Sequence, residues 1–412
     1  MSDIYLYKGK QNFLKGTDDE SKMAEIRQEL LKTFDVHNLS FLLGSGCSSY
    51  VKDDAEVGIP TMAPMATEYY DTFLDAADKT YLKDTVQIDI THENYKKNLE
   101  KFMEVLFSYK YLLESRENAA ELATLQAFID KTKKFIFDKC INQEQEVIDI
   151  YRAFYKKLVY RDNNLAKTNI FTTNYDLFSE RALDQLGIIY SNGFSGNIER
   201  YFNPAVFNYA FAEQMELSNG KWNVIDNFVY LYKLHGSVSW IEDEESKHLF
   251  KIKELQEPIM GSNVMIYPTP VKQNASFGSP YSDLFREFQK KLMKANNVLV
   301  TVGYSFSDEH INNLIFQALT IPTFRLIIIG GKTEKNIEKL LELNDPRIWV
   351  IGGGGEWDEI TGQWTQTPIH FFKRMVEELL PAIDAQGEIE KSVEAIRTLF
   401  SEPFNTANEH MQ

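Results

Sequence analysis

The feature that most constrains the fold is a regular alternation of apolar strands and amphipathic helices in the second half of the chain. Short apolar runs predict strands, and the segments between them repeat apolar residues at helical spacing. The predicted elements are strand 264–267, helix 281–296, strand 298–302, helix 309–319, strand 325–329, helix 333–343 and strand 348–351. We therefore expect an α/β fold with a doubly wound, mostly parallel, Rossmann-like sheet.

Four predicted strands end abruptly in glycine or polar residues. The strand 39–43 runs into Gly44-Ser45-Gly46, and the strand 169–172 runs into Thr173-Asn174-Tyr175-Asp176. The strand 228–234 leads to His235, and the strand 298–302 leads to the segment 303–308. Open α/β sheets bind ligands in the crevice at the carboxyl ends of their strands, so we expect the site there.

Each of these polar groups also has a purely structural interpretation. The glycines at 44 and 46 can form an ordinary turn, or they can let backbone approach a ligand in front of a helix N-terminus that binds a pyrophosphate. Asp176 can cap a helix that runs to Gly187. A histidine at a strand end, such as His235, is often a satisfied structural group.

Two later glycine segments are further candidates for the site. Residues 330–332 (Gly-Gly-Lys) and 352–355 (four glycines) both follow strands. An adenosine moiety could lie against bare backbone there, although the second run could also be a mobile loop. The sequence favours neither interpretation.

Composition limits the possible function classes. The chain has 412 residues with a formal net charge of −16, which argues against direct binding of nucleic acid. Its 2 cysteines and 7 scattered histidines predict no structural metal site and a reducing compartment. Residues 1–11 lack the apolar core of a signal peptide, and no later segment is apolar over a membrane-spanning length. We therefore expect a cytoplasmic protein with no membrane contact.

The expected organisation divides the chain into four parts. A flexible arm, through residue 15, and an amphipathic helix occupy residues 1–37. The Rossmann-like domain comprises 38–63 and 161–360, and it is interrupted by a large helical insertion at 64–160, where apolar residues recur at helical spacing. Residues 361–412 are expected to form C-terminal helices.

Taken together in chain order, the strand-end motifs resemble the sirtuin family of NAD-dependent enzymes. The matching segments are Gly44-Ser45-Gly46 with Gly58-Ile59-Pro60, Thr173-Asn174-Tyr175-Asp176, His235-Gly236 and Gly303-Tyr304-Ser305. Two features depart from the family pattern. The four-cysteine zinc ribbon of sirtuin deacylases cannot be built, and the arginine that follows Gly-Ile-Pro is replaced by the segment 60–63 (Pro-Thr-Met-Ala). With the helical insertion, the chain looks like the bacterial sirtuin-like proteins of antiphage defence that hydrolyse NAD.

The resemblance implies roles for the strand-end residues. Asn174 would hold the ribose hydroxyls or the attacking water, Asp176 would supply negative field or orientation, and His235 would take a proton. Asp308 would cap the next helix or reach a ribose hydroxyl. The implied contacts to phosphate and ribose of NAD come from Gly44, Ser45, Gly46, Thr173, Gly303, Ser305, Ser307 and Asp308.

The function that the resemblance implies is an NAD+ glycohydrolase that acts by abortive infection. NAD would be the substrate, and no metal would take part. The alternatives are an NAD-dependent protein deacylase and a non-catalytic nucleotide-sensing subunit. A hydride-transferring dehydrogenase is disfavoured, because Ser49 stands where the dinucleotide fingerprint has its third glycine.

Regulation and assembly are expected to depend on parts outside the catalytic motifs. An unrestrained NADase would exhaust the cofactor of its own cell, so we expect a homo-oligomer with little resting activity. The overall pattern is closest to the subunit that partners a HerA-type ATPase or helicase, to which any contact with DNA would then belong.

Overall fold

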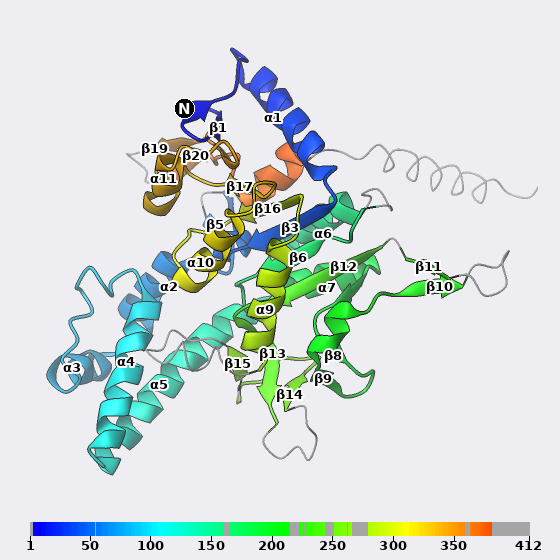
Figure 1. Ribbon diagram of the computed structural model, residues 1–412. Helices are drawn as coiled ribbons and strands as arrows, with labels where there is room; N and C mark the ends of the chain where they lie inside the picture. Colours follow the sequence, from blue (N-terminus) through cyan, green and yellow to red (C-terminus); the bar gives the residue numbers. More distant parts are fainter. Residues whose placement is uncertain are drawn as a thin grey trace, which may run out of the picture.

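A nine-stranded sheet organises the protein, which is described here by a computed structural model (Figure 1). The residues that the structure describes are 3–53, 55–159, 165–214, 222–225, 227–243, 251–261, 263–265, 279–358 and 363–380. In spatial order the strands are β2 (Gln11–Asn12), β1 (Tyr5–Lys8), β18 (Ile348–Gly352), β17 (Arg325–Ile329), β16 (Asn297–Val302), β3 (Asn38–Leu43), β6 (Asn169–Thr172), β12 (Phe228–Lys233) and β7 (Ile189–Ser191). The strands from β18 to β7 run parallel, which confirms the expected α/β fold.

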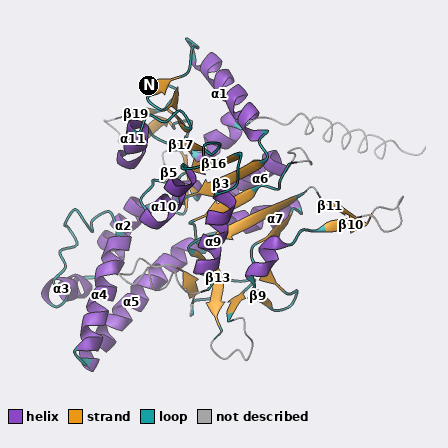
Figure 2. Cartoon of the chain, in the orientation of Figure 1, coloured by secondary structure: helices purple, strands orange, loops and turns teal. Residues whose placement is uncertain are grey.

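Helices cover both faces of this sheet (Figure 2). On β3, Phe41 points into the core beneath one set of helices, whereas Leu42 points into the core beneath the other, because successive strand side chains alternate between faces. The first set includes α1 (Asp19–Phe34), α6 (Gln145–Val159), α7 (Phe178–Leu186), α12 (Phe372–Arg374) and η4 (Met375–Leu379). The second set is α9 (Tyr281–Leu292), α10 (Glu309–Ala318) and α11 (Lys335–Glu342).

A helical segment separates β3 from β6 in the chain. It contains α2 (Met62–Glu68), η2 (Tyr69–Phe73), α3 (Ala76–Asp84), α4 (Leu99–Ser115), α5 (Ala119–Cys140) and α6. In Figure 1 the paired helices α4 and α5 project away from the sheet. Their stripe of buried aromatic and aliphatic side chains, such as Phe102 and Phe128, packs between the helices, as the helical spacing predicts.

Smaller antiparallel sheets complete the fold. One has the order β15 (Asn263–Met265), β13 (Gly236–Glu242), β14 (Ile252–Glu254), β9 (Arg200–Phe202) and β8 (Phe194–Ser195). Three hairpins are β4–β5 (Ser49–Lys52, Ala55–Gly58), β10–β11 (Ala212–Gln214, Trp222–Val224) and β19–β20 (Glu356–Asp358, Gln363–Gln366), and η1 (Ser45–Cys47) and η3 (Pro204–Asn208) are short 3₁₀ turns. The chain leaves the main sheet between β12 and β13, where Gly236 has a φ of +86° that favours glycine.

The expectation of a flexible N-terminal arm is wrong. Residues 5–8 form β1, which pairs antiparallel with β18, and the side chains of Ile4, Tyr5 and Leu6 are buried. These residues form a strand because of a tertiary contact. Without β1, the backbone N–H and C=O groups of β18 would lie unpaired at the edge of the sheet. The arm is therefore part of the sheet.

Two glycine segments also differ from expectation. The turn at residues 44–46 leads into η1 and the β4–β5 hairpin. The α-helix whose N-terminus was expected to bind a pyrophosphate therefore does not follow this turn. The glycines at 352–355 pack tightly against neighbouring backbone; a Cβ on Gly353 would lie 2.0 Å from the carbonyl oxygen of Asp3. The second run is therefore a packing element.

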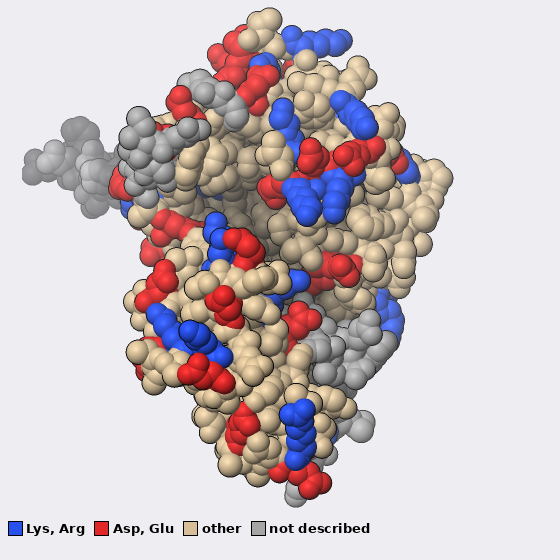
Figure 3. Space-filling view, turned by 90° about the vertical axis from the view of Figure 1, so that its left-hand side faces the viewer, with Lys and Arg blue, Asp and Glu red and all other residues tan. Residues whose placement is uncertain are grey.

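On the face in Figure 3, Lys and Arg side chains alternate with Asp and Glu among the described residues. No continuous basic surface is visible on that part of the molecule. Among the described helices, none is both long and apolar enough to cross a membrane. Predicted strand 264–267 extends past the described residues, as does the predicted helical tail after residue 380.

Candidate active site

A cavity of about 710 Å³ opens at the carboxyl ends of the central strands. The chain passes from β3 to β6, β7 and β12 on one side of the sheet and then returns to β16, β17 and β18 on the other. This reversal makes a crevice beside β3, which is where open α/β sheets bind ligands. The cavity volume is within the range of roughly 300–1,000 Å³ that is usual for small-molecule sites.

The polar turn after β6 forms the centre of the cavity. The Asn174 side chain is 8% exposed, and its Nδ2 donates hydrogen bonds to the Gly44 carbonyl at 2.9 Å and to the Ser48 hydroxyl at 2.9 Å. Both donors of the carboxamide are thus used for positioning. The turn therefore presents a fixed, nearly buried amide to whatever occupies the cavity.

The Asp176 carboxylate lies both at the start of α7 and at the cavity. Its Oδ1 accepts a hydrogen bond from the backbone N–H of Phe178 at 3.1 Å, at the start of α7. Its Oδ2 accepts a hydrogen bond from the Ser48 hydroxyl at 2.6 Å, while the residue also lines the cavity. Ser48 thereby links Asn174 and Asp176, a function that its sequence position, several residues after β3, did not reveal.

His235 follows β12 directly and is 8% exposed. Its Nε2 lies 3.1 Å from Oδ2 of Asp308, and its ring lies 6.5 Å from the ring of Tyr175. A carboxylate bonded to one ring nitrogen fixes the tautomer and the orientation of the imidazole. Sequence reasoning did not anticipate this pair.

The segment after β16 carries the partner of His235. Oδ1 of Asp308 accepts hydrogen bonds from the backbone N–H groups of His310 at 2.9 Å and Ile311 at 3.2 Å, so Asp308 caps α10 as the sequence suggested. The Ser305 hydroxyl donates to the Ser307 hydroxyl at 3.2 Å. Together, these residues place hydroxyl groups and the positive end of α10 at the cavity.

The glycines of the first turn have a packing role. A Cβ on Gly44 would lie 2.3 Å from the carbonyl oxygen of Gly303, and a Cβ on Gly46 would lie 2.9 Å from the Gly303 Cα. The ends of β3 and β16 therefore approach each other through bare backbone. Gly44 and Gly46 are not among the residues that line the cavity.

The remaining predicted residues do line the cavity. They are Ser45, Thr173, Asn174, Asp176, His235, Gly303, Ser305, Ser307 and Asp308. Apolar residues that the sequence analysis did not name as site residues also contribute, among them Met62, Met65, Met103 and Ile136. Only the tertiary arrangement brings their helices, α2, α4 and α5, against the strand ends.

Charge in the cavity is mostly negative. Asp176, Glu100, Asp308 and Glu309 line it, and Lys97 is the one Lys or Arg among the described lining residues. Carboxylates stabilise a cationic group, whereas hydroxyls and backbone N–H groups can hold phosphates without a full positive charge. The site is thus suited to a ligand that carries a positive charge next to polar groups.

A thiol nucleophile does not fit this cavity. Cys140 lines it, but burial raises the pKa of the Cys140 thiol to about 12, and the nearby Asp176 charge acts in the same direction. Burial also raises the pKa of Cys47. The reactive form of cysteine is the thiolate, so both groups are unreactive at neutral pH. Among the described residues, no group of three or more His, Cys, Asp or Glu side chains is placed to hold a metal ion.

Comparison with protein families identifies residues 168–347 as a match to the SIR2-like domain. The matched segment contains β6, β12, β16 and β17 together with Asn174, Asp176, His235 and Asp308. This match supports a sirtuin-like Rossmann fold and an NAD-related function. Comparison with curated proteins finds no match for the chain.

Proposed function

We propose that the chain is an NAD+ glycohydrolase, which releases nicotinamide and ADP-ribose. The observation that carries the proposal is the convergence of Asn174, Asp176 and the His235–Asp308 pair on one cavity at the sheet switch point. The SIR2-like match over the same strands supports NAD as the substrate. Fold alone would not suffice, because function depends on the site.

Hydrolysis of NAD+ requires that the site stabilise the cationic sugar and that it accept a proton from water. The bond between C1′ of the ribose and the ring nitrogen breaks, and nicotinamide leaves as a neutral molecule with the electron pair. The sugar becomes oxocarbenium-like, and the negative field from Asp176 would stabilise it. Water then adds to C1′ and must lose a proton, which His235 would accept while Asp308 holds the imidazole in place.

Asn174 would position the water or the ribose hydroxyls. Its Nδ2 is committed to Gly44 and Ser48, so its orientation is fixed before the substrate arrives. Fixing the reacting groups in advance removes part of the entropic barrier. The carboxamide oxygen is the atom that would accept a hydrogen bond from the substrate or the water.

A protein deacylase using the same NAD chemistry is the second candidate. Two observations favour hydrolysis instead. The chain has 2 cysteines, so it cannot build the four-cysteine zinc ribbon of sirtuin deacylases. Met62 and Met65 of α2 and Met103 of α4 share the cavity with the strand ends, which suits a free dinucleotide.

The test is to incubate the purified chain with NAD and to quantify nicotinamide and ADP-ribose by chromatography. We expect both products in equal amounts, and we expect none from His235→Ala. His92→Ala, a change at an exposed histidine of the insertion, is the matched control and should retain full activity. Nicotinamide release that requires an acylated peptide would instead establish the deacylase, and NAD binding without turnover would establish a nucleotide sensor.

The biological setting is part of the same proposal. An NADase that exhausts the cofactor of an infected cell would act as an antiphage effector, and such an enzyme requires restraint at rest. We propose a homo-oligomer whose partner is a HerA-type ATPase. Mass in solution and NAD turnover, measured for the chain alone and then with that ATPase and DNA, test this. A monomer that turns over NAD at full rate, unchanged by the ATPase, would refute it.

A further inference from the structure

A buried lysine lies directly behind the polar turn of the site. Lys233 is the last residue of β12, two positions before His235, and its side chain is 1% exposed. A lysine is almost never fully buried unless it is paired. The strand pattern around it is otherwise apolar, so a charged residue at this position calls for a specific explanation.

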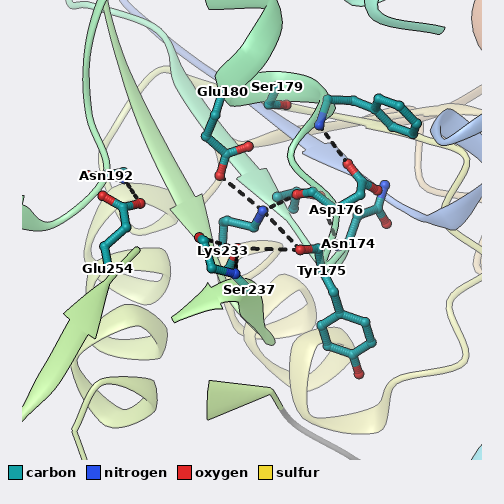
Figure 4. A network of polar contacts seen from close by, with 12 residues as sticks. Asn174, Tyr175, Asp176, Ser179, Glu180, Asn192, Lys233, Ser237 and Glu254 are labelled. Carbon is teal, nitrogen blue, oxygen red and sulfur yellow. Dashed lines mark hydrogen bonds and ion pairs between the residues drawn. The ribbon is translucent and has the colours of Figure 1, made fainter. Parts of the chain in front are cut away.

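The ammonium group of Lys233 uses its three donors on three acceptors (Figure 4). Nζ donates to the backbone carbonyl of Asp176, to the backbone carbonyl of Tyr175 at 3.4 Å and to Oε1 of Glu180 at 3.0 Å. Two of these acceptors are the carbonyls of the turn that carries Asn174 and Asp176. Lys233 therefore ties the strand of His235 to that turn.

Glu180 completes the pair from the first turn of α7. Its side chain is 8% exposed, and burial raises the pKa of its carboxyl, which the Lys233 ammonium opposes. A buried ion pair is weak support for stability, because the cost of removing two charges from water can exceed their attraction. An apolar pair of similar size would fill the same space, so stability alone does not account for the lysine.

We propose that Lys233 is a positioning residue, which holds the turn of Asn174 and Asp176 in register with His235. The inference rests on the proposed NAD hydrolysis for its catalytic consequence, but the positioning itself is a property of the structure. His235 is placed by β12, and Asn174 and Asp176 are placed by β6. The Lys233 side chain joins these two strand ends, in addition to the Leu234 N–H that donates to the Thr172 carbonyl at 2.8 Å. Ser48 joins Asn174 to Asp176 on the side of the cavity.

The first measurement is steady-state NAD turnover by Lys233→Met, which keeps the length of the side chain but removes the donors. We expect kcat to fall about 100-fold, because a displacement of about 1 Å at a reacting group costs that much. KM should change less than about threefold, because Lys233 does not line the cavity. A parental kcat in this variant would overturn the proposal.

Loss of folding is separated from loss of positioning by a double variant. Lys233→Met with Glu180→Leu replaces the ion pair by apolar groups, which is often neutral or stabilising. We expect its unfolding midpoint in urea to recover relative to Lys233→Met while kcat stays low, since the Asp176 carbonyl still lacks the Lys233 donor. The Tyr175 carbonyl keeps its contacts with the Val238 N–H and the Ser237 hydroxyl in this variant. Recovery of kcat together with the midpoint would show that Lys233 acts only through stability.

The matched control is Glu254→Gln. In Figure 4, Oε1 of Glu254 accepts a hydrogen bond from Asn192 Nδ2, at 2.7 Å. Oε2 of Glu254 pairs with Arg200 at 2.8 Å. These contacts do not involve the turn. This variant should keep the parental kcat at pH 7.5, and a loss as large as that of Lys233→Met would contradict a specific role for Lys233.

Hydrogen exchange separates this inference from the proposed function. Amide exchange in the peptide that spans 173–178 should accelerate in the double variant, while exchange in β16 stays unchanged. If the parental chain releases no nicotinamide from NAD, the proposed function fails, but the exchange measurement still decides whether Lys233 holds the turn. Unchanged exchange in 173–178 would refute the positioning role.

Discussion

The contact between His235 and Asp308 leads to a prediction that separates catalysis from folding. Oδ1 of Asp308 caps α10 through two backbone N–H groups, and Oδ2 lies 3.1 Å from Nε2 of His235. One carboxylate oxygen therefore caps a helix, and the other contacts the imidazole. Substitutions that keep the cap and remove the contact with His235 should lower NAD turnover without lowering stability.

Three substitutions at Asp308 make the separation. Asn and Ser both cap helices well, whereas Ala does not, so we expect only Asp308→Ala to lose about 1 kcal/mol of unfolding free energy. All three lose the carboxylate that fixes the imidazole of His235. In Asp308→Asn the amide group faces Nε2, and in Asp308→Ser the side chain is too short to reach it. NAD turnover should fall by about 100-fold or more in each, the usual size of a general-base contribution.

The assay pairs nicotinamide release with unfolding in urea. Asp75 provides the control, because its side chain caps α3 by accepting a hydrogen bond from the backbone of Asp78 at 2.8 Å, away from the cavity. Asp75→Ala should lower stability and leave turnover unchanged. If Asp308→Asn turned over NAD at the parental rate, the idea that the Asp308 carboxylate orients His235 would be refuted. If turnover in the three Asp308 variants followed stability alone, the contact would be structural.

Three further predictions concern other parts of the molecule. His235→Ala and Asn174→Ala should each abolish nicotinamide release with native circular dichroism, and release by either folded variant would contradict the site. Gly44→Ala should cost about 2 kcal/mol or more of unfolding free energy in urea, because its Cβ would lie 2.3 Å from a carbonyl oxygen. Gly261→Ala should cost little, because an added Cβ there meets no atom of the described residues within 4 Å. Burial raises the pKa of Glu254 from 4.5 to about 7, although Arg200 opposes the shift, so the protonated carboxyl stabilises the folded state fully below pH 4.5 and this stabilisation is lost as pH rises through 7. The unfolding free energy should therefore fall by about 3 kcal/mol between pH 4.5 and 8, and Glu254→Gln should remove this fall. An equal fall in Glu254→Gln would show that another group causes it.

Much of the sheet could be predicted because parallel strands carry a strong local signal. The prediction of a strand at 325–329 coincides with β17, and 298–302 lies within β16. Buried parallel strands are continuous apolar runs, and their ends are marked by glycine and polar residues. The convergence of Asn174, Asp176 and His235 then followed from the rule that the carboxyl ends of parallel strands meet at one edge.

Other features could not be predicted, because they depend on contacts distant in sequence. The four residues of β1 form a strand only because β18 offers an edge, and the segment alone has too few residues to signal this. The close approach of Gly44 to Gly303 is equally invisible, since a glycine turn and a glycine packing contact have the same sequence. Lys233 at a strand end would usually indicate solvent, and only its three buried acceptors show otherwise.

Two helices begin at the candidate site, and their first turns are built by the same side chains that face the cavity. Asp176 accepts the N–H of Phe178 at the start of α7, and Asp308 caps α10. A helix N-terminus carries partial positive charge, which favours the ionised carboxylate. Each acid is thus held in place at the start of a helix, while its second oxygen is directed to Ser48 or to His235. If the proposed function holds, local unfolding of either helix start would displace one of these carboxylates from the cavity, and NAD turnover would fall although the substrate contacts neither helix interior.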